Sequence, residues 1–318
     1  MTIQVNTYDT LEEWRLKSNE MGVKIADLDN NLYTINVIAS GNITVSGNLT
    51  SGGNLVVSGN ATVEGNIKTA ANVVVDRELF VTSNAIVSGN VVATGNIITS
   101  SNLAVSRDAI VTGNIRTAAN VVVDRELFVT SNAIISRNVI VTGNIITSSN
   151  IAVSQDVIVT GNIQSASHVN IARDARITGN IYLGGNISVN GNAIVTGNIT
   201  TAGNVQISRE LFVTSNAIVS GNVVATGNII TSSNLAVSRD AIVTGNIRTA
   251  ANVIVDRELF VTSNAIISGN VVATGNIRTA ANVIVDRELF VTSNAIISGN
   301  VVATGNIRTA ANVIVDRE

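Results

Sequence analysis

The sequence has no cysteine and no proline, a single histidine and only 3% aromatic residues. Without cysteine, disulfides contribute nothing to its stability. Charged residues make up 13% of the chain and the net charge is −3, so we expect neither nucleic-acid binding nor polybasic attachment to membranes. The start of the chain lacks the basic and apolar segments of a secretory signal. No apolar run approaches the ~20 residues of a membrane-spanning helix, so we expect no membrane insertion.

What the chain does have is a six-residue repeat that runs from Gly41 to its end. It begins GNITVS GNLTSG GNLVVS GNATVE and continues without insertion or deletion through 46 complete hexads. A perfect short period over such a length is typical of a repeat protein in which each unit stacks on its neighbours. It argues against a globular enzyme, whose loops vary in length.

Within each hexad, the apolar positions alternate as in a β-strand. The third position is Ile, Val, Leu or Ala in all 46 hexads, and the fifth is apolar in 35 and Ser or Thr in 11. Positions 3 and 5 therefore point to the same side, which we expect to be the interior. Position 2 is Asn in 36 hexads and usually follows Gly, Ser or Ala, residues suited to corners. The sequence thus predicts an all-β triangular β-helix with one hexad per face, and stacked Asn residues that form hydrogen-bonded ladders at its corners.

Two architectures share this pattern. One chain can wind alone as a left-handed solenoid with three hexads per coil, or three chains can intertwine with one hexad each in every layer. At a strand spacing of ~4.8 Å, the lone solenoid advances roughly 74 Å and the trimer roughly 220 Å. The hexad RELFVT recurs at intervals that are not multiples of three hexads, so in a lone solenoid it lands on a new face each time. Its copies start at Arg77, Arg125, Arg209, Arg257 and Arg287.

Residues 9–36 follow a different period, which favours the intertwined homotrimer. Their apolar and small residues alternate at spacings of three and four, as at the a and d positions of a coiled coil. Parallel helices of this kind bring several copies of the β segment together in register. We therefore predict an attachment segment at 1–8, a coiled-coil helix at 9–36, a transition at 37–40 and the β-helical shaft at 41–318. The predicted oligomerisation residues are Leu11, Trp14, Ser18, Met21, Ile25, Leu28, Leu32 and Ile35.

Few residues are suited to catalysis. Acyltransferases with hexapeptide repeats need a histidine general base, and His168 is the only histidine, at a corner position that is normally Asn. We interpret it as a corner substitution and expect no enzyme activity, no metal site and no cofactor. The acidic and basic residues of motifs such as Asp256-Arg257-Glu258 are interpreted as corner charges that pair between adjacent strands.

All five phenylalanines occupy position 4 of the hexad RELFVT and are predicted to face outwards. An apolar outer face can indicate lateral association, although aromatic and β-branched residues also favour strands in general. These possible lateral contacts are Phe80, Phe128, Phe212, Phe260 and Phe290.

The N-terminal heptad segment TYDTLEEWRLKSNEMG, followed by units such as GNITVSGN and VVATGNI, resembles the tail-fibre and virion fibre proteins of tailed phages, those of marine cyanobacterial phages in particular. This resemblance implies a homotrimeric shaft in the virion, assembled in the host cytoplasm and bound at its N-terminus to a virion or baseplate protein. It also implies a distal receptor-binding tip, which the shaft holds away from the particle. The alternative is a single-chain β-solenoid that forms a cellular filament or a surface adhesin stalk, with a hexapeptide-repeat acyltransferase as a third hypothesis.

Overall fold

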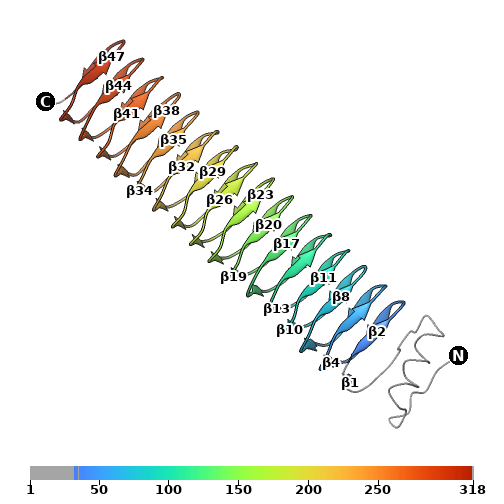
Figure 1. The fold of residues 1–318 in the computed structure, drawn as a ribbon. Coiled ribbons are helices and arrows are strands. Elements are labelled where there is room, and N and C mark those ends of the chain that lie inside the picture. The colour runs from blue at the N-terminus through green and yellow to red at the C-terminus, as the bar shows by residue number, and fades with distance from the viewer. Residues whose placement is uncertain (1–31, 35, 317–318) are drawn as a thin grey trace, which may run out of the picture. The chain divides into compact units, whose positions relative to one another are not determined.

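The computed structural model describes residues 32–34 and 36–316, which form three-residue β-strands; from residue 37 onwards, three-residue corners join these strands. The chain divides into two compact units, unit 1 (residues 1–131) and unit 2 (residues 132–318). In each unit the chain winds in successive coils, three strands to a coil (Figure 1). Within a unit, strands one coil apart pair in parallel, so the strands of each unit form three parallel sheets.

We name the sheets of unit 1 A1, B1 and C1, and those of unit 2 A2, B2 and C2. Sheet A1 contains β1 (Leu32–Thr34), β4 (Leu49–Ser51), β7 (Ile67–Thr69), β10 (Ala85–Val87), β13 (Leu103–Val105) and β16 (Val121–Val123). Sheet B1 contains β2 (Val37–Ala39), β5 (Leu55–Val57), β8 (Val73–Val75), β11 (Val91–Ala93), β14 (Ala109–Val111) and β17 (Leu127–Val129). Sheet C1 contains β3 (Ile43–Val45), β6 (Ala61–Val63), β9 (Leu79–Val81), β12 (Ile97–Thr99) and β15 (Ile115–Thr117).

Unit 2 repeats this arrangement over more coils. Sheet A2 contains β19 (Val139–Val141), β22 (Val157–Val159), β25 (Ala175–Ile177), β28 (Ala193–Val195), β31 (Leu211–Val213), β34 (Ile229–Thr231), β37 (Ile247–Thr249), β40 (Ala265–Ile267), β43 (Val283–Val285) and β46 (Val301–Ala303). Sheet B2 contains β20 (Ile145–Thr147), β23 (Ile163–Ser165), β26 (Ile181–Leu183), β29 (Ile199–Thr201), β32 (Ala217–Val219), β35 (Leu235–Val237), β38 (Val253–Val255), β41 (Val271–Ala273), β44 (Leu289–Val291) and β47 (Ile307–Thr309). Sheet C2 contains β18 (Ala133–Ile135), β21 (Ile151–Val153), β24 (Val169–Ile171), β27 (Ile187–Val189), β30 (Val205–Ile207), β33 (Val223–Ala225), β36 (Ala241–Val243), β39 (Leu259–Val261), β42 (Ile277–Thr279), β45 (Ala295–Ile297) and β48 (Val313–Val315).

The inside and outside of each coil follow the alternation predicted from the hexads. From β3 to β45, the first and third residues of every strand are buried and the middle residue points outwards. Leu211 and Val213, for example, are 1% and 0% exposed, whereas Phe212 between them is 36% exposed. Full burial of a Val, Leu or Ile side chain is worth about 1.5–3 kcal/mol, so these two rows per sheet supply most of the stabilisation. The predicted triangular β-helix is confirmed in this respect.

In this structure one chain winds by itself, and the intertwined homotrimer that the heptads favoured is not confirmed. β31 pairs with β28 and β34 of the same chain, and Leu211 lies beside Ala193 and Ile229, 18 residues away on either side. Three hexads thus complete one coil. The backbone groups of each corner also bond to the neighbouring coil: Thr214 N donates to Val195 O at 2.9 Å, and Leu211 N to Asn228 O at 2.9 Å. Because one chain satisfies these groups by itself, the coils need no strands from other chains.

The β structure begins earlier than the hexads predict. Leu32, expected in the coiled-coil helix, starts strand β1 and pairs with Leu49 of β4, and strand β2 (Val37–Ala39) occupies the expected transition. The helix prediction is therefore wrong at residues 32–34. Leu32 fits both patterns, because apolar residues occur at heptad positions as well as in strands. The other predicted oligomerisation residues, Leu11, Trp14, Ser18, Met21, Ile25, Leu28 and Ile35, lie outside the described residues.

Corner glycines are explained by close stacking of the coils and not by a left-handed backbone. A Cβ atom on Gly221 would lie 2.4 Å from Asn204 Oδ1 and 2.5 Å from Gly203 O of the preceding coil. The φ angle of Gly221 is outside the left-handed region. Glycine suits this position because the backbones of the two coils approach one another so closely that a Cβ atom would force one of them to shift.

Candidate functional site

The outward side chains of the strands line the faces of the coils in each unit. All five predicted lateral-contact phenylalanines point outwards, as expected, and are 36–41% exposed. They do not share one face: in unit 2, Phe212 lies on A2, Phe260 on C2 and Phe290 on B2. Each lies in an identical RELFVT hexad. The expectation that RELFVT lands on a new face each time in a lone solenoid is confirmed for unit 2.

Asparagine ladders run along the corners, as predicted. At the corner that follows sheet A2, Asn198 Oδ1 accepts from Asn216 N at 3.1 Å, from Asn216 Nδ2 at 3.3 Å and from Ser215 Oγ at 2.7 Å. Asn216 Oδ1 then accepts from Asn234 N at 3.2 Å in the next coil. Each amide oxygen therefore satisfies corner donors of the following coil, which the strand hydrogen bonds leave unpaired.

His168 takes the place of an asparagine in one of these ladders. Its backbone N–H donates to Asn150 Oδ1 at 3.2 Å, and its Nδ1 accepts from Asn186 N at 2.9 Å, as an amide oxygen does elsewhere. A shallow depression beside it is lined by neutral polar groups, among them Asn170, Ser188 and Gln206 of sheet C2. Nδ1 acts as the acceptor in the neutral tautomer with the proton on Nε2. This geometry supports the interpretation of His168 as a corner substitution.

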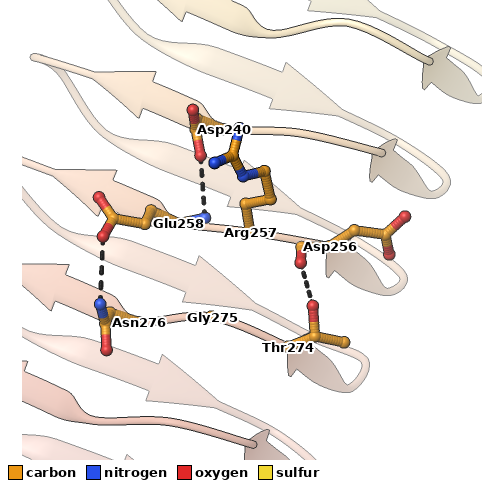
Figure 2. A pocket seen from close by; sticks show the side chains of 7 residues that line it. All are labelled: Asp240, Asp256, Arg257, Glu258, Thr274, Gly275 and Asn276. Carbon is orange, nitrogen blue, oxygen red and sulfur yellow. Dashed lines mark hydrogen bonds between the residues drawn. The ribbon is translucent and has the colours of Figure 1, made fainter.

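The charged motifs lie at corners of successive coils. Arg125 Nε is 3.8 Å from Asp108 Oδ1 in unit 1, an ion pair between adjacent coils of the predicted kind. The equivalent corner of unit 2 contains Asp240, Arg257 and Glu258, and Figure 2 shows the side chain of Arg257 extended towards Asp240. Exposed pairs of this kind contribute about 0–1 kcal/mol each.

Hydrogen bonds within this corner of unit 2 hold its carboxylates in place. Asp240 Oδ1 accepts from Glu258 N at 3.2 Å, and Glu258 Oε1 accepts from Asn276 Nδ2 at 3.1 Å. Thr274 Oγ1 donates to the backbone oxygen of Asp256 (Figure 2). The acidic groups are thus used in contacts between coils. Among residues 32–34 and 36–316, no three His, Cys, Asp or Glu side chains come together as metal ligands.

The part of the chain that the structure describes contains no helix long and apolar enough to cross a membrane. Its repeating coils, corner ladders and outward apolar residues define a parallel β-solenoid repeat protein.

Comparison with protein families adds a specific similarity within unit 2. The model of the family described as "Bactofilin: Polymer-forming cytoskeletal" matches residues 133–226. The match runs from β18 to the end of β33 and covers less than a third of the chain, so it marks a similarity to this family. Neither the search of curated proteins nor that of solved structures gives a significant match.

This match corrects the resemblance to phage fibres. The matching family is a polymer-forming cytoskeletal one, which overturns the prediction of a tail-fibre shaft and its placement in the virion. Together with the single-chain winding, it supports a filament-forming β-solenoid of the cell over a virion shaft. The phage interpretation was wrong because hexads rich in Gly, Asn and β-branched residues satisfy the same requirements of strand and corner in any β-helical rod.

Proposed function

We propose that this chain is a structural subunit of a cellular filament, and that it acts through stiffness and self-association and not through catalysis. The observation that carries the proposal is the match of residues 133–226 to a polymer-forming cytoskeletal family. These residues lie in uninterrupted coils of unit 2, with no insertion that could form a substrate pocket.

The coil itself supplies a physical basis for polymerisation. Each coil bonds to the next through the same backbone groups, for example Val223 N to Asp240 O at 2.9 Å. A sheet edge presents a row of such groups, which is a template for strands of another chain. A second copy that continues the stack would therefore add the hydrogen bonds that coils already make with one another.

Electron microscopy of the purified full-length chain tests this proposal, together with light scattering over a range of protein concentrations. We expect filaments longer than one subunit, whose oriented fibres diffract at the ~4.8 Å strand spacing along the filament axis. A protein that stays monomeric at every concentration and salt condition would refute the proposal.

Two neighbouring substitutions separate filaments of folded subunits from aggregates of unfolded chains. Val223 is fully buried and Val224, the next residue, is 37% exposed. Val223→Asp should unfold the local coils and abolish filaments, whereas Val224→Asp should leave the coils intact and filaments present. Equal fibre formation by both variants would mean that the fibres are not made of native coils.

A further inference from the structure

In the coils from β23 to β30, sheet A2 differs from the other two faces of unit 2 in its outward residues. Over the strands from β23 to β30, B2 presents Gln164, Tyr182 and Thr200, and C2 presents Asn170, Ser188 and Gln206. Over the same coils, the outward residues of face A2 include only one polar residue, Arg176, and a second, Arg248, lies further along the stack. Its outward residues, in the order in which their strands pair, are Ile140, Ile158, Arg176, Ile194, Phe212, Ile230, Arg248, Ile266, Ile284 and Val302.

In the column from Ile140 to Ile284, the order of residue types is the same in both directions along the stack. Phe212 is at its centre, with an isoleucine on the next strand on either side. Arg176 and Arg248 lie two strands from Phe212 in opposite directions, and each is followed outwards by two isoleucines. A surface that repeats itself on reversal can contact an identical copy of itself about a two-fold axis, so that residue i meets residue j and j meets i.

The two edges of face A2 also suit close approach of a second copy. Beyond the ends of its strands, the first residue of each corner is small and neutral from Thr142 to Ser268. Before its strands lie charged corner residues, among them Asp174 beside Arg176 and the pair Arg209 and Glu210 beside Phe212, all of them exposed. One edge is therefore sterically open, and the other carries charges of both signs.

The area of the face is sufficient for a weak dimer. From Ile140 to Ile284 there are eight strand spacings of ~4.8 Å, or about 38 Å, and a strand with one flanking residue on each side is about 16 Å wide. Face-to-face contact would bury about 600 Å² per copy, or about 1,200 Å² in total, which is at the lower end of specific interfaces. Four apolar residues of this column are at least 36% exposed, namely Ile140, Ile158, Phe212 and Ile266, and Arg176 and Arg248 are exposed as well.

We propose that sheet A2 binds sheet A2 of a second copy of this chain, with the two solenoids antiparallel and a two-fold axis along strand β31 at Phe212. This axis brings the two Phe212 rings together and places Arg209 of each copy opposite Glu210 of the other. Arg176 lies at the level of Arg248 of the second copy, and Asp174, in the same coil as Arg176, adds a negative charge at the edge of the face at this level. This interface is lateral, so it is independent of end-to-end stacking and goes beyond the proposed filament.

Cysteine crosslinking tests the face and the direction of pairing, because the chain contains no cysteine of its own. Phe212→Cys should form a disulfide-linked dimer on mild oxidation of the full-length protein. Phe260→Cys and Phe290→Cys are matched controls, since they lie in the same hexad RELFVT on C2 and B2. For direction, Ile140→Cys should crosslink to Ile284→Cys when the two variants are mixed, and neither should crosslink to itself.

A charge at the centre of the face provides a second measurement. Phe212→Lys should shift the dimer to monomer in sedimentation equilibrium, while Phe260→Lys should leave the distribution unchanged; circular dichroism should show native strands in both. Equal crosslinking of the three cysteine variants, no crosslinking of Phe212→Cys, or self-crosslinking of Ile140→Cys would overturn the proposal. Filaments without the Phe212 crosslink would refute lateral pairing and leave the filament proposal standing. Crosslinked dimers without filaments would support lateral pairing and refute the filament proposal.

Discussion

Two buried threonines in identical hexads should respond to the same substitution with opposite signs. Thr249 and Thr279 both occupy position 5 of the hexad GNIRTA and are 1% and 3% exposed. Thr249 Oγ1 lies 3.2 Å from the Oγ1 of Thr231 in the preceding coil, within hydrogen-bond distance. Thr279 lies between Val261 and Ile297, and its Oγ1 has no hydrogen-bond partner. The difference therefore comes from the neighbouring coils and not from the hexad.

Valine has nearly the shape of threonine and lacks the hydroxyl. Thr279→Val removes a buried unpaired hydroxyl, so we expect the free energy of unfolding to rise by about 1–2 kcal/mol. Thr249→Val removes a hydrogen bond between coils, so we expect it to fall by about 0.5–1.5 kcal/mol. Because unfolding entropy scales with chain length, 1 kcal/mol corresponds to about 1.5 °C in a chain of this size, and the two variants should differ in Tm by about 2–5 °C.

Thermal unfolding followed by circular dichroism, in parallel with guanidinium titration, measures both variants against the parent chain. The order expected is Thr279→Val above the parent and Thr249→Val below it. If both variants shift in the same direction by the same amount, hydrogen bonding between stacked position-5 side chains does not control the stability of the interior.

Three further outcomes follow from the coil geometry. Ile97→Asp should destabilise the chain by about 3–5 kcal/mol, because residue 97 is fully buried. Ile98→Asp, on the outer surface, should change the free energy of unfolding by less than about 0.5 kcal/mol. Equal effects in denaturant titration would show that the assignment of inside and outside is incorrect. His168→Asn should preserve Tm because it keeps a corner acceptor for the next coil. His168→Leu removes this acceptor and should lower the free energy of unfolding by about 1–2 kcal/mol. An unchanged Tm in the leucine variant would exclude a role for Nδ1 in the ladder. Deletion of residues 89–106 removes one coil and should leave a chain that folds cooperatively. Deletion of residues 89–91 puts corner residues in the interior and should abolish cooperative folding. Similar melting curves for the two deletions would rule out the hexad as the structural unit.

The periodicity of the sequence was sufficient to predict much of the local structure. Alternation at positions 3 and 5 identified the buried and outward residues, because strand side chains alternate regardless of which strand lies next to them. The Asn ladders and the place of His168 in one of them also followed, since every sixth residue turns the same kind of corner. The two periods overlap at Leu32, and there the heptad pattern gave the wrong element.

What the hexads could not give is the identity of the neighbouring strand. A hexad packs equally well against the hexad 18 residues away in its own chain or against the hexad of another chain, because both offer the same hydrogen bonds and apolar side chains. Only the pairing of strands such as β31 with β28 and β34 fixes 18 residues as the coil. That spacing decides which outward residues share a face, and so separates Phe212 from Phe260 and Phe290 despite their identical hexads. Local sequence determines whether a side chain points in or out, whereas its neighbours on the surface depend on how many hexads close a coil, which is a property of the tertiary structure alone.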